Sequence, residues 1–350
     1  MRQQRDDGVD PIDDRRAKRA VKRIEAEKAM TFRKCAEAYI KAHQAEWRSP
    51  KSIAAWEGTL AMYAYPAIGD LPVQDIDTAL VMKVLEPAWS RAPETANRLR
   101  GRIEAILGWA TTSGFREGEN PARWRGHLEN LLAKPGDAKA RKREAKGRTA
   151  HHPALPYPEI GGFMVELRKE GGMGARALEF AILTAARTGE VIGARWDEFD
   201  DPMQPTLWTV PAERMKARKE HRIPLSAPAA AIVKEMAAIR SGDLVFPGIR
   251  HGEGMSNMTL LALLRRMKRT DLTVHGFRST FRDWAAERTN FPAEVAEMAL
   301  AHAVGDKVEA AYRRGDLFQK RRQLADAWAR FCAAPAPVAS GSVVAMRAAK

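Results

Sequence analysis

Apolar side chains recur every three or four residues through much of the chain, a spacing typical of helices with one buried face. The first such stripe consists of Phe32, Ala36, Tyr39 and Ile40. Three more helices are predicted: one that starts at Ser52, one over residues 78–86 and one over residues 94–109. Pro66 is expected in the loop after the second helix, and Pro87 is expected to end the third. Residues 30–132 are therefore predicted to form an all-helical domain.

The pattern changes in a second domain, predicted over residues 154–332. Two short runs, residues 207–210 and 221–225, read as strands joined by a polar turn and predict an antiparallel hairpin. The helices expected around it cover residues 158–168, 175–186, 227–240, 256–268, 275–289, 293–303 and 307–314. The predicted fold class is mainly α, with a helical N-terminal domain and a mixed α/β domain that has a small antiparallel sheet.

Three segments outside these domains have little apolar content. Residues 1–29 are dominated by charge and predict an exposed arm or helix, and residues 333–350 predict a disordered tail. Residues 133–153 form a linker with a net positive strip that can lie along a phosphate backbone, although a solvated linker has the same composition. The basic side chains of the strip are Lys139, Arg141, Lys142, Arg143, Lys146 and Arg148.

The overall charge narrows the choice of partner. Among 350 residues, 58 Lys and Arg exceed 44 Asp and Glu, which gives a net charge of +14. This excess favours nucleic acid as the partner ahead of an anionic membrane surface, although a merely basic protein shows the same balance. With only Cys35 and Cys332 there is neither a disulfide framework nor a cysteine zinc site, and we expect a cytoplasmic protein.

Several function classes lack the sequence features that they need. The N-terminus has no apolar core of a signal peptide, and no apolar run is long enough to cross a bilayer. Neither a phosphate-binding glycine loop nor a His-Glu-x-x-His motif is present. We therefore expect no membrane association, no metal and no cofactor.

The second domain places polar groups at unusual positions. An apolar helix ends at Arg187, and Thr188 is expected to cap the next helix. Lys216 lies in the hairpin turn, where its ammonium can reach a cleft, and Arg218 and Lys219 compete for the same role. Taken alone, a surface ion pair for Arg187 and a solvated turn for the lysine remain open.

Three further positions follow along the chain. His275 and Arg278 share a helix face, separate from the apolar stripe of Phe277, Phe281 and Trp284. His302 continues the apolar face of a helix that is expected to end just before Gly305, and Tyr312 lies on a short helix of small residues. The alternatives at this point are that the histidines are hydrogen-bonded residues of the core and that the tyrosine is a packing residue of the core or an interface.

Together these side chains suit cleavage of a phosphodiester. Two arginines can hold the non-bridging oxygens, and a lysine can protonate the leaving oxygen. Histidines can orient the phosphate and help to deprotonate a nucleophile. A tyrosine hydroxyl has an ordinary pKa of about 10, so it needs such electropositive surroundings to attack.

In the order and spacing of these groups the sequence resembles the tyrosine recombinases, and closely the phage and genomic-island integrases. Arg278 precedes His302 by 24 residues, and His302 precedes Tyr312 by 10. The resemblance covers roughly residues 10–332. It implies that the helical domain at 30–132 binds core-type sites of double-stranded DNA, and that the protein is bacterial and nucleoid-associated. The matching motifs are Thr184-Ala185-Ala186-Arg187-Thr188-Gly189-Glu190, Arg214-Met215-Lys216, His275-Gly276-Phe277-Arg278, Leu300-Ala301-His302 and Ala311-Tyr312.

The resemblance implies a role for each residue. Tyr312 would attack the phosphate, forming a 3′-phosphotyrosyl link and releasing a 5′-hydroxyl. Arg187 and Arg278 would clamp the phosphate, and Lys216 would be the general acid for the 5′-oxygen. The supporting residues would be His275 and His302 in proton transfer, and Glu190 behind the first arginine.

The resemblance also implies an assembly: a homotetramer that exchanges strands of two duplexes at core-type sites through a Holliday junction, with possible DNA-bending or directionality factors. The two domains would close on DNA as a C-shaped clamp. Residues 317–332 are expected to pack on a neighbouring protomer, with packing on their own domain as the alternative. Integrases often carry an additional N-terminal domain for arm-type sites, and residues 1–29 are expected to be only its tail, as in a truncated integrase or one that uses simple core sites.

Two other functions remain open from the sequence. A type IB topoisomerase-like enzyme uses the same chemistry but reseals the same strand. A non-catalytic DNA-binding or architectural protein derived from an integrase would keep the fold without the reaction.

Overall fold

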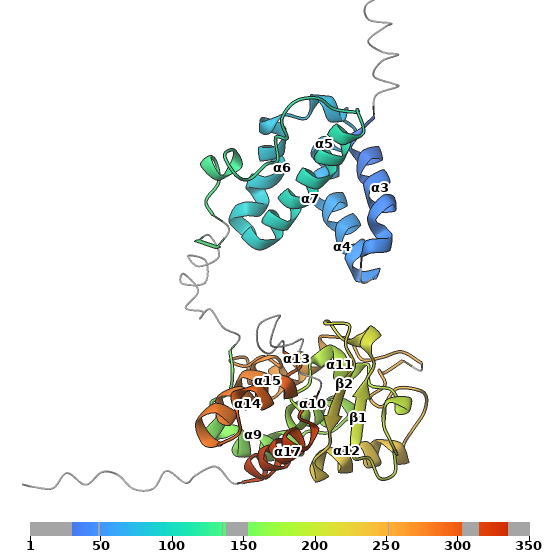
Figure 1. The fold of residues 1–350 in the computed structure, drawn as a ribbon, viewed down its shortest axis with the longest axis vertical. Helices are drawn as coiled ribbons and strands as arrows, with labels where there is room; N and C mark the ends of the chain where they lie inside the picture. Colours follow the sequence, from blue (N-terminus) through green and yellow to red (C-terminus); the bar gives the residue numbers. More distant parts are fainter. Residues whose placement is uncertain are drawn as a thin grey trace, which may run out of the picture. The chain divides into compact units, whose positions relative to one another are not determined.

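The computed structural model describes residues 30–47, 50–134, 136–137, 153–250, 252–302 and 315–334. The chain divides into two compact units, Met1–Ala150 and His151–Lys350 (Figure 1). None of the described helices has the length and apolar character that a bilayer crossing requires. Several expectations concern residues outside the described ones: the arm at 1–29, the basic strip at 139–148, the helix at 307–314 and the tail from 335 onward.

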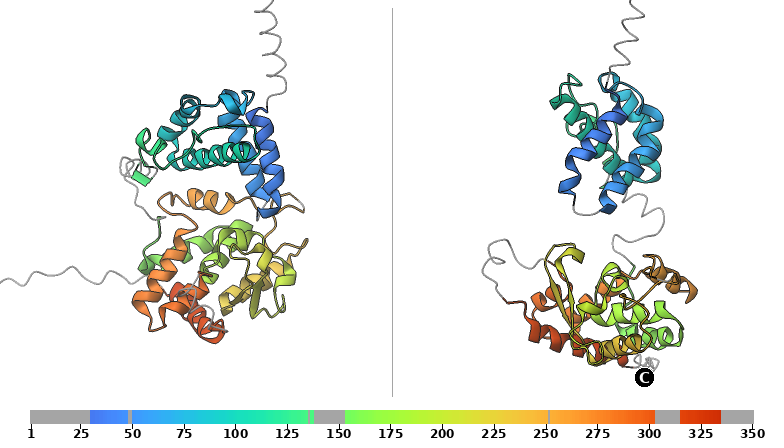
Figure 2. Two further views of the ribbon diagram at one scale, coloured as in Figure 1. Left: turned by 45° about the horizontal axis from the view of Figure 1, so that its top comes forward. Right: turned by 90° about the vertical axis from the view of Figure 1, so that its right-hand side faces the viewer.

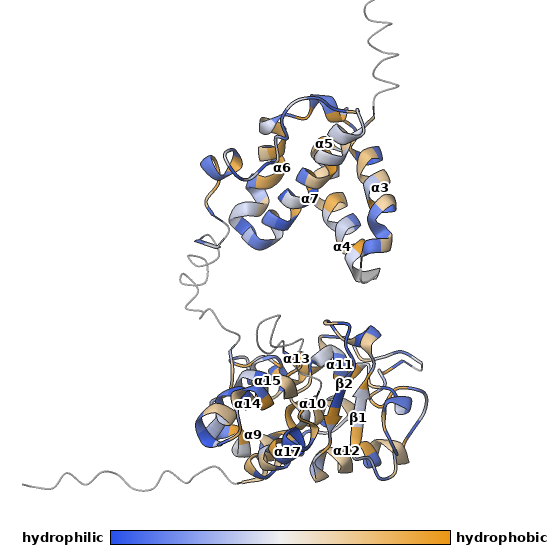
Figure 3. Ribbon diagram, in the orientation of Figure 1, coloured by the Kyte–Doolittle hydropathy of each residue, from blue (hydrophilic) through white to orange (hydrophobic). Residues whose placement is uncertain are grey.

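The regular structure described in the first unit is helical, as predicted. Its α-helices are α3 (Phe32–His43), α4 (Pro50–Thr59), α5 (Tyr65–Ile68), α6 (Thr78–Arg91) and α7 (Pro93–Thr112), with a π-helical turn η2 (Leu60–Ala64) between α4 and α5. The 3-10 turns are η1 (Gln44–Glu46), η3 (Val73–Asp75) and η4 (Leu128–Asn130). Polar and apolar residues alternate around these helices, so each has one face for the core (Figure 3).

Two prolines lie inside helices, contrary to the sequence prediction. Pro66 is in the first turn of α5, where a missing N–H costs nothing because the first amides of a helix have no partner within it. Pro87 lies in the interior of α6, which continues to Arg91. The next turn contributes Ala88 and Trp89 to the core, and this burial offsets the hydrogen bond lost at the proline.

The second unit surrounds a two-stranded sheet with helices, which confirms the predicted fold class. The strands β1 (Leu207–Val210) and β2 (His221–Pro224) pair antiparallel, with Trp208 opposite Ile223. The helices are α9 (Ile160–Lys169), α10 (Met173–Thr184), α11 (Thr188–Ile192), α12 (Ala227–Ala238), α13 (Thr259–Arg266), α14 (Gly276–Arg288), α15 (Ala293–Ala299) and α17 (Phe318–Ala333). The 3-10 turns are η5 (Tyr157–Glu159), η6 (Trp196–Glu198) and η7 (Ala212–Arg214).

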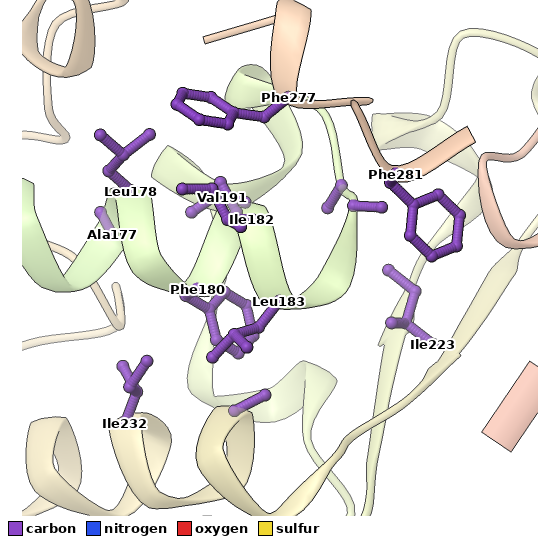
Figure 4. Close-up of a cluster of buried hydrophobic side chains, with 14 of the residues drawn as sticks. Ala177, Leu178, Phe180, Ile182, Leu183, Val191, Ile223, Ile232, Phe277 and Phe281 are labelled. Atoms are coloured by element: carbon purple, nitrogen blue, oxygen red, sulfur yellow. The ribbon is translucent and has the colours of Figure 1, made fainter. Parts of the chain in front are cut away.

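Helix α10 lies at the centre of this unit. Residues 177–184 are all buried, so α10 is buried on every side rather than on one stripe. Its side chains lie between Ile232 of α12 and Phe277 of α14 (Figure 4). A helix that is packed on all sides has a fixed position, and its C-terminal end leads directly to Arg187.

Helix α17 packs on its own unit, which corrects the expectation that it docks on a neighbouring protomer. Leu324 and Trp328 are fully buried, and the Trp328 indole N–H donates to the Ile182 carbonyl of α10 (2.9 Å). Trp328 also packs against Trp284 of α14, with ring centroids 4.9 Å apart and ring planes tilted by 48°. The apolar face of α17 that was expected to contact another protomer is therefore buried in its own unit, and β2 packs beside the helix (Figure 2).

Candidate active site

Arg187 lies in the turn between α10 and α11, where Glu190 holds it. Ala185, just after α10, has a left-handed backbone (φ 51°) that redirects the chain. The backbone N–H and Nη1 of Arg187 donate to the two carboxylate oxygens of the buried Glu190, at 2.8 Å each. The prediction that Thr188 caps α11 is wrong. Thr188 is the first residue of the helix, and Arg187 occupies the cap position.

Arg278 is a buried cation that joins the ends of two helices. It projects from α14 and is only 5% exposed. Nη1 donates to the Ala185 carbonyl at the end of α10, and Nη2 donates to the Leu300 carbonyl at the end of α15 (2.6 Å). Its Nε has no hydrogen-bond partner among the described residues. Burial, and then the charge of Arg187, lower the pKa of Arg278 to about 10, so it remains charged at neutral pH.

The end of α15 differs from the predicted helix at residues 293–303. Regular helix stops at Ala299, and Ala301 has a left-handed backbone (φ 49°). The amides of Ala301 and His302 return to the carbonyls of Met298 (3.0 Å) and Glu297 (2.9 Å), which is a Schellman ending without glycine. His302 therefore does not continue the apolar face of α15, and its side chain is 42% exposed.

The two arginines and His302 come together at this helix end. Arg187 Nη2 donates to the carbonyls of Leu300 (3.4 Å) and Ala301 (3.2 Å), so both arginines reach the Leu300 oxygen. Nε2 of His302 lies 3.3 Å from Nη2 of Arg278. Segments more than 110 residues apart in the sequence thus present two guanidinium groups and an imidazole at one place. Such a cluster attracts an anion with several oxygens.

Arg214 is a supporting residue to which the sequence analysis gave no role. It donates from Nη1 to the buried Glu198 carboxylate and from Nη2 to the Glu190 carbonyl. The other Glu198 oxygen accepts the Trp208 indole N–H (2.9 Å). The side chain also crosses the face of Gly193, where an added Cβ would lie 2.9 Å from Nη2. No sequence spacing reveals this network, because its members meet only when the hairpin packs on α11.

His221 is a second residue that the sequence analysis did not single out. It begins β2, and its Nε2 lies 3.3 Å from the Ala299 carbonyl at the end of α15. Burial and the charge of Arg321 lower its pKa to about 4, so it is a neutral hydrogen-bond donor at physiological pH. It lines a small cavity of about 20 Å³ beneath the α15 end, together with Phe281 and Leu324. Its lining includes Ala299, the residue before the Leu300 carbonyl that both arginines reach.

Two other predicted site residues, Lys216 and His275, have exposed side chains. Lys216 follows the buried Met215 in the β1–β2 turn. His275 is the N-cap of α14, one turn before Arg278. Gly276 allows this placement, since a Cβ there would lie 2.1 Å from the Pro153 carbonyl oxygen.

Two family models match the chain. The "Phage integrase central domain" matches residues 32–127, and the "Phage integrase family" matches residues 166–316, which contain the whole arginine and histidine cluster. The chain belongs to the phage integrase family of tyrosine recombinases. The boundary between the two models falls between the two compact units of the fold.

Named integrases align over most of the chain. The prophage integrase IntA of Escherichia coli K12 is 31% identical over 286 residues, covering 80% of this chain and 64% of IntA. The integrase of Enterobacteria phage P4 is 30% identical over 294 residues, covering 78% of this chain and 63% of that protein. The chain thus spans just under two thirds of the length of these two integrases.

Solved integrase structures share the fold at lower identity. A lambda integrase tetramer bound to a Holliday junction gives a TM-score of 0.60 at 16% identity, over 85% of this chain and 81% of that one. A lambda integrase dimer bound to a COC′ core site gives 0.58 at 17% identity, over 79% of this chain and 98% of that one. At such identity the likeness is one of fold.

The remaining integrase-type residues lie outside the described part of the chain. Tyr312 falls in the gap at 303–314. The gap at 138–152 contains the basic strip with Lys139, Arg141, Lys142, Arg143, Lys146 and Arg148.

Proposed function

We propose that this protein is a site-specific DNA recombinase that cleaves and rejoins DNA through a covalent link to Tyr312. The observation that carries the proposal is that Arg187 and Arg278 meet at the Leu300 carbonyl, with His302 3.3 Å from Arg278. Two fixed guanidinium groups in a partly buried site match the charge and the oxygen geometry of a phosphodiester.

The reaction conserves the number of phosphoester bonds. The Tyr312 oxygen attacks the phosphorus, its proton passes to a histidine, and the bond to the 5′-oxygen breaks. Lys216 gives the leaving 5′-oxygen a proton. The product is a 3′-phosphotyrosyl link and a 5′-hydroxyl, and a 5′-hydroxyl from a partner duplex reverses the step. Strands therefore exchange without an external energy source.

The surrounding residues support this step in different ways. The arginines stabilise the charge that develops on the phosphate, and Glu190 keeps Arg187 in place through its two 2.8 Å contacts. His302 lies against Arg278 and shares the phosphate, while His275 approaches from the start of α14. Their part in proton transfer rests on the family motifs.

The proposed partner is double-stranded DNA at core-type sites, in the bacterial cytoplasm. The net charge of +14 and the basic strip at 139–148 favour such a partner. Related proteins of this fold are a lambda integrase dimer on a core site and a tetramer on a Holliday junction, and we propose the same homotetrameric assembly here. DNA-bending or directionality factors would act on this assembly.

Strand exchange between two labelled duplexes tests the proposal. Each duplex carries a junction from the ends of the element that contains the gene, and the product is scored on a denaturing gel. Site-dependent exchange supports a recombinase, whereas relaxation of supercoiled plasmid without exchange supports a topoisomerase-like enzyme. Protection of the site without any cleavage supports a DNA-binding protein. In each case the affinity should fall steeply with salt, because phosphate contacts release counterions.

A further inference from the structure

Glu297 makes two contacts that orient His302. It lies on α15, and one carboxylate oxygen is 2.6 Å from Nδ1 of His302. The other oxygen accepts Nε–H of Arg282, from α14, at 2.8 Å. The backbone also links the pair, since the His302 amide donates to the Glu297 carbonyl (2.9 Å). The imidazole is thus fixed in both position and rotation by one residue.

This contact decides which imidazole nitrogen faces the arginines. A carboxylate only accepts hydrogen bonds, so Nδ1 of His302 carries its hydrogen. In the neutral ring Nε2 then has the lone pair, and it lies 3.3 Å from Nη2 of Arg278. Glu297 is ionised: burial opposes this, but hydrogen bonds from His302 and Arg282 lower the pKa of its carboxyl group.

We infer that Glu297, held by Arg282, is a positioning residue that fixes the tautomer and the orientation of the His302 ring for DNA cleavage. The inference rests on the proposed function. Its chemistry is that of a carboxylate that accepts a hydrogen bond from a histidine and so sets the orientation of the ring.

Two positive charges lie at the same helix end as His302. Arg278 from α14 and Arg187 from the turn before α11 both donate to the Leu300 carbonyl, and Arg278 also contacts the imidazole. Glu190 is occupied by Arg187. Glu297 is therefore the carboxylate in hydrogen-bond contact with the imidazole that can offset the two guanidinium groups.

Single-turnover cleavage of a nicked suicide duplex by the full-length protein tests this role. Glu297→Gln should slow cleavage by about 10- to 100-fold, because the amide can donate to Nδ1 and so permits the wrong tautomer. The pH–rate profile should also change, because the carboxylate that contacts Nδ1 of His302 is gone. Glu297→Asp keeps the charge and should recover part of the rate. Affinity for the duplex should stay within about twofold.

Arg282→Gln distinguishes the loss of His302 positioning from the loss of the ion pair between α14 and α15. Both Arg282→Gln and Glu297→Gln break the α14–α15 ion pair, but only the second removes the carboxylate from His302. Arg282→Gln should cost no more than a few-fold in rate, with the pH profile nearly unchanged. Glu235→Gln, at an exposed position of α12, is the matched control for the substitution itself.

The outcomes separate this inference from the proposed function. Equal losses in Glu297→Gln and Arg282→Gln, or a Glu297→Gln variant with the rate and pH profile of the unmodified protein, would overturn the positioning role. If the unmodified protein binds the duplex but never cleaves it, the proposed function fails instead. Thermal unfolding of each variant confirms that all are folded at the assay temperature.

Discussion

Arg187 and Arg278 donate to the same main-chain oxygen, the carbonyl of Leu300, at 3.4 and 2.6 Å. Two positive charges so close together repel each other, and carbonyls at the C-terminal ends of α10 and α15 offset part of that cost. The partial negative charge at these helix ends therefore holds the two arginines together in the absence of a bound anion.

Arg278→Lys tests this view of the arginine pair. A lysine keeps the charge but cannot span the carbonyls of Ala185 and Leu300, so a buried acceptor is left without a partner. We expect the free energy of unfolding to fall by about 2 kcal/mol in urea titrations. Arg282→Lys, which alters a half-exposed ion pair, should change it by less than about 1 kcal/mol. Equal effects of the two substitutions would show that Arg278 does not join the helix ends.

His221→Gln probes the buried histidine through pH. The pKa of His221 is lowered to about 4 in the folded state, against an ordinary value near 6.5, so the unfolded chain binds more protons between these values. Stability therefore falls as pH drops from 6.5 to 4. Glutamine keeps an N–H for the Ala299 carbonyl but does not titrate. The free-energy difference between variant and unmodified protein should change by about 3 kcal/mol across this range. A constant difference would contradict the assignment.

Trp328→Ala distinguishes cis from trans packing of α17. The indole is fully buried in its own unit, so its removal should lower the free energy of unfolding by about 3–5 kcal/mol. The loss should be the same at any protein concentration, measured by thermal unfolding of dilute and concentrated samples. Arg330→Ala, at an exposed position of the same helix, should have little effect. A loss that appears only at high concentration would indicate a role between protomers.

Gly276→Ala tests the close approach at the start of α14. The new methyl group would overlap the Pro153 carbonyl oxygen at 2.1 Å, so the backbone must shift and His275 with it. We expect a clear drop in melting temperature. Gly189→Ala lies in the helical α11 with nothing within 4 Å of the new Cβ, and it should be neutral or slightly stabilising. The reverse ranking would contradict the packing described for the two glycines.

The periodic parts of the fold were predictable, and its irregular turns were not. Hydrophobic spacing indicates α7, α14 and the β1–β2 pair because burial follows that spacing. It does not indicate the left-handed backbone at Ala185 and Ala301, since alanine is not a residue that favours such turns. These two turns are held by arginines from elsewhere in the chain, so they depend on tertiary contacts.

The residues of the candidate site also fall into a predictable group and a group that the sequence did not indicate. Arg187, Arg278 and His302 were recognisable as motifs, and the structure brings them together. Glu297 belongs to no motif, and Arg214 was part of a motif in which only Lys216 was given a role; they act through partners 5 and 16 residues away. Their roles follow only from the geometry of helix ends. Pro87 shows the converse, because a strong local signal for a helix end was overridden by burial of Trp89.

The covalent step is tested most directly with a nicked suicide duplex that covers the junctions of the element. The cleaved strand end diffuses away, so the phosphotyrosyl protein accumulates and survives detergent. The unmodified protein and Tyr157→Phe should form this adduct, and Tyr312→Phe should form none while binding the duplex with unchanged affinity. An adduct that persists in Tyr312→Phe, or a bound and protected site with no adduct in the unmodified protein, would contradict the account.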